Sequence, residues 1–98
     1  MFKDQSVAIT GASGGIGRAI AEMFIAQGAQ VAISDLQTPT KTGAEIGAIA
    51  FACDVRSEEA VQNFINMAEA ANGPIDIFVS NAGVGLSLIH ISEPTRPY

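Results

Sequence analysis

The sequence is poor in the residues that build disulfide frameworks, membrane spans and basic surfaces. It holds one cysteine, Cys53, so a disulfide scaffold is excluded and a cytoplasmic location is expected. Five basic residues face ten acidic ones, and the net charge of -5 argues against partners such as nucleic acid or an anionic membrane. No apolar run is long enough to cross a bilayer, and the first residues do not read as a signal peptide.

Histidine and tyrosine, which often carry acid–base chemistry, are also scarce. The single histidine, His90, and the single tyrosine, Tyr98, both follow Gly85. His90 lies far from Cys53 and has no companions, so no metal site is predicted. Hydrophobic residues make up 48% of the chain and charged residues 15%, a balance that predicts one small domain with a packed core.

The most informative stretch that is present is the glycine-rich segment TGASGGIG, residues 10–17. An apolar run, Val7–Ile9, precedes it, and a helical pattern follows it. Glycines let the backbone turn with φ > 0 and approach a ligand closely. The start of a helix offers unpaired N–H groups and the positive end of its dipole to a phosphate. The segment therefore predicts a phosphate site, although a glycine turn can also serve the fold alone.

Short apolar runs alternate with helical patterns along the chain. Strands are predicted at 5–10, 30–34, 48–52 and 75–80, helices at 15–27 and 58–72, and a short helix or a loop within 36–47. The first helix is expected to bury Ile16, Ala19, Ile20, Met23 and Phe24, and the later one Val61, Phe64, Ile65 and Ala68. This alternation predicts an α/β fold, a Rossmann-type doubly wound parallel sheet.

The carboxyl ends of these strands carry the remaining candidate residues, and they meet at one edge of such a sheet. Asp35 could accept hydrogen bonds from ribose hydroxyls, and its charge would repel a 2′-phosphate; otherwise it starts a turn or caps a helix. Asp54 could accept from an adenine amino group or serve as a turn or cap residue. Asn81 could bond adjacent strands or occupy a turn. Cys53 is interpreted as a small buried residue, and the acids Glu58 and Glu59 as a solvated helix start.

Together these motifs resemble the short-chain dehydrogenase/reductase family. Residues 10–17 match its TGxxxGxG turn, Asp35 matches the acid of NAD-preferring members, Asp54-Val55 the adenine pair, and residues 81–83 the NAG motif. Ser13 and Leu36 stand where NADP-preferring members usually place a basic residue. The resemblance implies NAD as cofactor and a binding set of Gly11, Ser13, Gly15, Ile16, Gly17, Asp35, Leu36, Asp54, Val55, Asn81, Ala82 and Gly83.

The resemblance also implies that the parent protein is an oligomeric oxidoreductase that moves hydride between nicotinamide and an alcohol or ketone substrate. The family's catalytic serine and its YxxxK motif have no counterpart here, because Tyr98 is the last residue and no lysine follows Lys41. The chain itself is therefore predicted to be inactive, with no catalytic residue. Two alternatives remain open: a non-catalytic dinucleotide-binding or redox-sensing module, and an atypical NADP-regulated branch of the family.

The last residues depart from the family pattern. Residues 86–96, LSLIHISEPTR, resemble a translated transposase-type sequencing adapter, so we interpret 1–85 as part of a dinucleotide-binding domain and 86–98 as a non-native tail. The expected sheet is then truncated after its fourth strand, in the order 3-2-1-4. Its fourth strand would keep an open apolar edge, and stability would be marginal.

Overall fold

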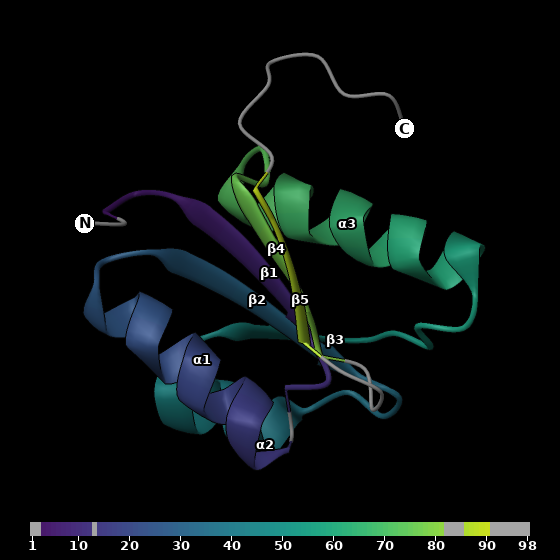
Figure 1. The fold of residues 1–98 in the computed structure, drawn as a ribbon, viewed down its shortest axis with the longest axis horizontal. Coiled ribbons are helices and arrows are strands. Elements are labelled where there is room, and N and C mark those ends of the chain that lie inside the picture. Colours follow the sequence, from purple (N-terminus) through teal and green to yellow (C-terminus); the bar gives the residue numbers. More distant parts are fainter. Residues whose placement is uncertain (1–2, 13, 82–85, 91–98) are drawn as a thin grey trace.

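The computed structural model describes residues 3–12, 14–81 and 86–90, which form one sheet with helices on both faces. The strands are β1 (Ser6–Thr10), β2 (Gln30–Asp35), β3 (Ile49–Ala52), β4 (Ile77–Asn81) and β5 (Leu86–His90); the helices are α1 (Gly15–Ala26), α2 (Thr40–Ile46) and α3 (Glu58–Asn72). The strand order is β3-β2-β1-β4-β5, and the first four strands are parallel. Figure 1 shows α1 and α2 on one face of the sheet and α3 on the other.

Side-chain alternation along the central strands divides the core into two layers. Val7 and Ile9 of β1 point to the layer that contains Phe24 of α1, whereas Ala8 points to the layer that contains Phe64 of α3. All five residues of β1 are buried, as expected for a parallel strand covered on both faces. The predicted α/β fold and the order 3-2-1-4 are confirmed.

The helix boundaries follow local backbone chemistry. Ser57 caps α3, since its hydroxyl accepts a hydrogen bond from the Ala60 N–H at 3.1 Å, and Gly28, with φ of 90°, follows the end of α1. The segment 36–47, left open between helix and loop, contains the seven-residue helix α2, which ends at Gly47 in the left-handed region with φ of 84°. Among the helices that the structure describes, none is long and apolar enough to cross a membrane.

The predicted buried face of α1 is partly wrong. Phe24 is buried as predicted and Ile20 packs half-buried against the core, but Ile16, Ala19 and Met23 are exposed. Gly17 and Ala21 are buried instead. The prediction followed the spacing of apolar residues, but close contact between the helix and the glycine turn places the small residues Gly17 and Ala21 on the buried face. The predicted face of α3 is correct: Phe64, Ile65 and Ala68 are buried, and Val61 packs against them.

The predicted open edge of β4 is wrong. β5 pairs with it antiparallel, in the register Ile77↔His90 to Asn81↔Leu86 (Figure 1). An unpaired strand edge presents a row of N–H and C=O groups that attracts any extended segment within reach. Four residues separate β4 from β5 in the sequence, a distance that suits antiparallel neighbours. The sheet therefore has five strands, although the four parallel ones carry the predicted topology.

A candidate dinucleotide site at the carboxyl edge of the sheet

The candidate residues meet at one edge because β1, β2, β3 and β4 run in the same direction. Thr10 pairs with Ser34, and Asp35 pairs with Ala52, so the ends of these three strands lie side by side. Asn81 ends β4 on the other side of β1, where its backbone N–H donates to the Thr10 Oγ1 at 3.1 Å. The glycine turn, Asp35, the residues after β3 and Asn81 therefore border one continuous edge. Figure 1 shows the four parallel strands that form it.

The first half of the glycine turn forms a junction, where the backbone of the turn lies against β2 and α1. Gly11 has φ of 66°, in the left-handed region that favours glycine, and the Ala12 N–H donates to the Ser34 carbonyl at 3.0 Å. A Cβ on Gly17 would lie 2.4 Å from the Gly11 oxygen and 2.8 Å from the Ala12 Cα. Only glycine at position 17 lets α1 come this close to the turn.

The second half of the turn is open. A Cβ on Gly15 would have no described heavy atom within 4 Å, and one on Gly14 would come no closer than 3.9 Å, to the Gly11 oxygen. Gly14 occupies the N-cap of α1 and has no side chain to cap it, and no acid stands in the first helical turn. Free space, helix N–H groups and the positive end of the helix dipole therefore coincide, a combination that suits a phosphate.

Asn81 ties β4 to this turn. Its side-chain Nδ2 donates to the Gly11 carbonyl at 3.3 Å, in addition to the bond between its backbone and the Thr10 hydroxyl. Of the two roles open for Asn81, the structure thus contains the bond between neighbouring strands. Sequence reasoning did not single out Thr10; a polar residue at the end of a fully buried strand was the available signal.

Asp35 stands at the end of β2 and is half-buried. Its Oδ1 accepts from the Leu36 N–H at 2.8 Å, and its carbonyl accepts from the Cys53 N–H at 2.8 Å. The second bond joins β2 to the segment that follows β3, and so brings Asp54 close to Asp35 in the fold. Two acids consequently border the same end of the edge.

Asp54 has a partner that the sequence analysis did not anticipate. Arg56 donates three hydrogen bonds to it: from Nε to Oδ1 at 3.1 Å, from Nη2 to Oδ2 at 3.0 Å, and from its backbone N–H to Oδ1 at 3.0 Å. The side-chain bonds lower the pKa of Asp54 most, and the backbone bond adds to this shift. The Asp54 carbonyl also accepts from the Ser57 N–H at 3.0 Å, so the predicted turn role is present as well.

Large apolar side chains are exposed along this edge. Ile16 in the first turn of α1 is 66% exposed, Leu36 directly after β2 is 63% exposed, and Val55, three residues after β3, is 38% exposed. Exposed apolar side chains cost solvation free energy unless a ligand or partner covers them. Their position beside the open turn suits the apolar surfaces of a flat ring system.

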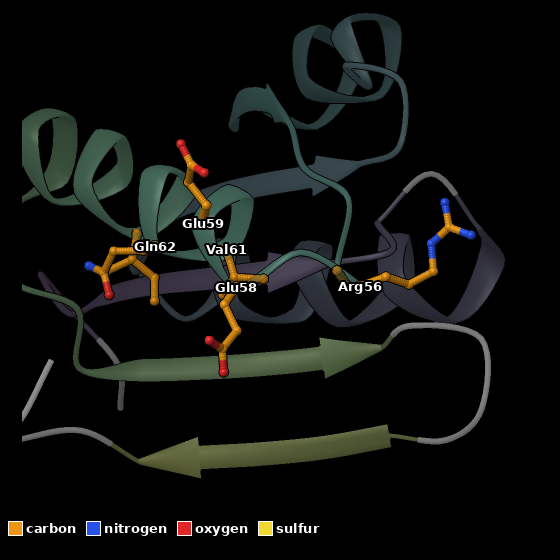
Figure 2. A pocket seen from close by; sticks show the side chains of 7 residues that line it. Arg56, Glu58, Glu59, Val61 and Gln62 are labelled. Atoms are coloured by element: carbon orange, nitrogen blue, oxygen red, sulfur yellow. The ribbon is translucent and has the colours of Figure 1, made fainter.

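A hollow of about 610 Å³ adjoins this end of the edge (Figure 2). Val55 and Arg56 border it, and the other lining residues, Glu58, Glu59, Val61, Gln62 and Ile65, belong to α3. Figure 2 shows Arg56 extending away from α3, in the direction in which β4 runs. Because the hollow lies over α3 rather than over the glycine turn, it is a neighbour of the candidate site and not the site itself.

The remaining sequence predictions concern Cys53, metal ligands and three residues of the binding set. Cys53 is buried as predicted, and burial, followed by the charge of Asp54, raises the pKa of its thiol. No group of three or more potential metal ligands occurs among the described residues. Ser13, Ala82 and Gly83, which belong to the predicted binding set, lie outside the residues that the structure describes.

Comparison with known proteins identifies the family of the chain. The family model for short chain dehydrogenases matches residues 5–96, so the chain belongs to the short-chain dehydrogenase/reductase family. The match continues past Gly85, the limit of the resemblance seen in the motifs. The probable oxidoreductase EphD of Mycobacterium tuberculosis is 39% identical over 99% of this chain, and the sorbose reductase of Candida albicans is 43% identical over 85%.

The similarity extends to solved structures. The NADH complex of 3-ketoacyl-(acyl-carrier-protein) reductase from Brucella melitensis superposes with a TM-score of 0.75 and 30% identity, over 80% of this chain and 34% of that one. The chain spans 18% of the length of EphD and 32% of the sorbose reductase. The matched part of each relative is thus a fraction of a longer protein.

Proposed function

We propose that this chain is the cofactor-binding part of an NAD(H)-dependent oxidoreductase that interconverts an alcohol and a ketone. The observation that carries the proposal is the open half of the glycine turn, where Gly15 borders free space at an uncapped helix start. Family membership and the NADH complex of the Brucella reductase support the same cofactor class. When bound, the nicotinamide would supply the hydride chemistry.

Each part of the edge has a role in this proposal. The N–H groups at the start of α1 would hold the pyrophosphate, Asp35 the adenosine ribose, and Asp54 with Val55 the adenine. Asn81, with Ala82 and Gly83, would border the ribose on the nicotinamide side. Leu36 and Ile16 would cover apolar surfaces of the dinucleotide, which accounts for their exposure without it.

The preference for NAD(H) over NADP(H) rests on the Asp35 charge. A carboxylate beside the ribose attracts its 2′-hydroxyl and repels a 2′-phosphate. Asp54 is neutralised by its ion pair with Arg56, so the preference for the unphosphorylated cofactor depends on Asp35 alone. The similarity to oxidoreductases favours an enzyme over the alternative of a non-catalytic binding module.

The proposal includes the wider setting of the parent protein. We infer a small alcohol or ketone substrate, a homo-oligomer, and the cytoplasm, where a lone buried thiol such as Cys53 stays reduced. We also propose that residues 1–85 belong to the dinucleotide-binding domain and that residues 86–98 derive from an adapter. The original sequence read tests it: authentic coding sequence continuing through residues 86–98 would contradict an adapter origin.

A titration of the ¹⁵N-labelled chain with NADH tests the binding site. The amide signals of Gly15 and Val55 are expected to shift in a saturable way, because they border the pyrophosphate and adenine positions. Gly15→Val is the matched variant, since a Cβ at this position would enter open space. A variant that folds yet binds NADH as well as the original chain would contradict the proposed site, as would an original chain that does not bind.

A further inference from the structure

Arg56 lies beside the proposed adenine position but belongs to none of the motifs above. It is one of the few basic residues of the chain, and its side chain is 81% exposed. Arg18, another basic residue, is paired with Glu45 at 2.7 Å on the opposite face of the sheet. Arg56 is instead directed at Asp54, one of the two acids at the adenosine end of the edge.

The Arg56 guanidinium and the Asp54 carboxylate form a bidentate pair, called the fork below. Two nitrogens of one planar guanidinium meet the two oxygens of one carboxylate, at 3.1 Å and 3.0 Å, which fixes the plane of the carboxylate as well as its position. The backbone N–H of Arg56 binds the same Oδ1 at 3.0 Å. A lysine could supply the charge but not two parallel bonds in a fixed plane.

The two carboxylate oxygens of Asp54 accept unequal numbers of hydrogen bonds. Oδ1 accepts two bonds within the described structure, whereas Oδ2 accepts one. A carboxylate oxygen has room for about two donors, so Oδ2 is the atom with remaining acceptor capacity. Its position is set by Arg56, and the Asp54 side chain is still 36% exposed to an incoming ligand.

From this arrangement we propose that Arg56 is a positioning residue for adenine recognition. It holds the Asp54 carboxylate so that Oδ2 accepts a hydrogen bond from the exocyclic amino group of the bound dinucleotide. This inference rests on the proposed function, since it names the residue that orients one contact of the same cofactor. A preset carboxylate loses less side-chain freedom on binding, so affinity improves without a direct contact between Arg56 and the ligand.

Two dinucleotides separate positioning from a general structural role. NADH carries the 6-amino group, and its analogue with purine in place of adenine lacks only that group. Arg56→Ala is expected to weaken NADH binding by about two- to fivefold, as removal of an exposed ion pair suggests, and to leave the purine analogue unchanged. Arg56→Lys is expected to lose most of the same preference, because the fork is lost while the charge remains.

Two controls complete the experiment. Lys3→Ala removes the same charge from an exposed residue just before β1, at the other edge of the sheet, and is expected to change both affinities equally. In an Asp54→Ala background, Arg56→Ala is expected to have no further effect on the ratio of the two affinities. Binding is followed by the backbone amide of Val55 in every variant, and also by the Nε–H signal of Arg56 where the arginine is retained.

The possible outcomes separate the positioning role of Arg56 from the proposed cofactor binding on which it rests. Equal weakening of NADH and the purine analogue by Arg56→Ala, or an unchanged NADH affinity, would overturn the positioning role while leaving the site intact. If Arg56→Lys kept the full preference for NADH over the purine analogue, the two parallel bonds of the fork would not be required. An original chain that binds neither dinucleotide would instead overturn the proposed function, and the role of Arg56 with it.

Discussion

At the glycine end of the carboxyl edge, backbone lies against backbone, whereas at the Asp35 end charged side chains lie partly in water. Gly17 packs within contact distance of the Gly11 carbonyl, and buried Thr10 bonds Asn81. Asp54 and Arg56 are held by one exposed ion pair. The first arrangement supports both fold and site, so it can hardly be altered without loss of stability. The second can be changed while the fold is retained, so it is where specificity can be adjusted.

The largest expected effect is at Gly17. Gly17→Ala places a methyl group 2.4 Å from a backbone oxygen, and the helix or the turn must move; we expect a loss of about 2–3 kcal/mol in the free energy of unfolding. Gly15→Ala is the matched control, because its methyl group meets open space and alanine favours a helix. Urea denaturation of the two variants checks this, and equal stabilities would show that the junction is not close-packed.

Thr10 provides the next test of the glycine end. Thr10→Val keeps the shape of the side chain but leaves the Asn81 N–H without its acceptor, at an expected cost of about 1–2 kcal/mol. Hydrogen exchange identifies the cause, because the Asn81 amide should exchange faster in Thr10→Val. In Thr10→Ser a buried methyl group is lost, yet the amide should stay protected. Equal protection of Asn81 in both variants would contradict this role of the Thr10 hydroxyl.

At the opposite end, Asp35 should affect binding rather than folding. Asp35→Asn removes the negative charge while retaining an oxygen that can accept from the Leu36 N–H. We expect the ratio of NADH to NADPH affinity to fall about fivefold, which corresponds to about 1 kcal/mol, with stability changed by less than about 0.5 kcal/mol. Binding titrations with both cofactors measure the ratio. An unchanged ratio would remove the main argument for NAD(H).

This contrast also explains what the sequence can predict. The four parallel strands follow from short apolar runs with turn residues at their ends, because a strand buried on both faces has no polar alternation. The edge site follows from topology, since parallel strands bring their carboxyl ends together. The buried face of α1 does not follow fully from the spacing of apolar residues: close backbone contact at Gly17 rotates the helix, and Ile16 is left exposed.

Two other features depend on contacts that periodicity does not encode. β5 is a strand because an unpaired edge of β4 lies within reach, and no repeat within residues 86–90 specifies that partner. The bond between Arg56 and Asp54 requires a turn that returns the Arg56 side chain to a residue two positions earlier. Residue spacing indicated the possibility of a turn at Asp54, but the direction of the guanidinium depends on the fold around it.

The smallest effect is expected from acid titration of Asp54. Arg56 holds the pKa of this carboxyl below its ordinary value, first through its side-chain bonds and then through its backbone N–H. The stabilisation is therefore complete above the pKa of the unfolded chain and is lost as the pH falls through the lower pKa of the folded chain. Because the pair is exposed, stability should change little over this range.

The measurement is a titration of the carboxyl ¹³C signals from about pH 5 to about pH 2. The pKa of Asp54 should be higher in Arg56→Ala than in the original chain. It should still lie below its ordinary value, because the backbone N–H bond persists. An identical pKa in both chains would mean that the guanidinium does not hold Asp54 in solution, and the two ends of the edge would then differ only in packing.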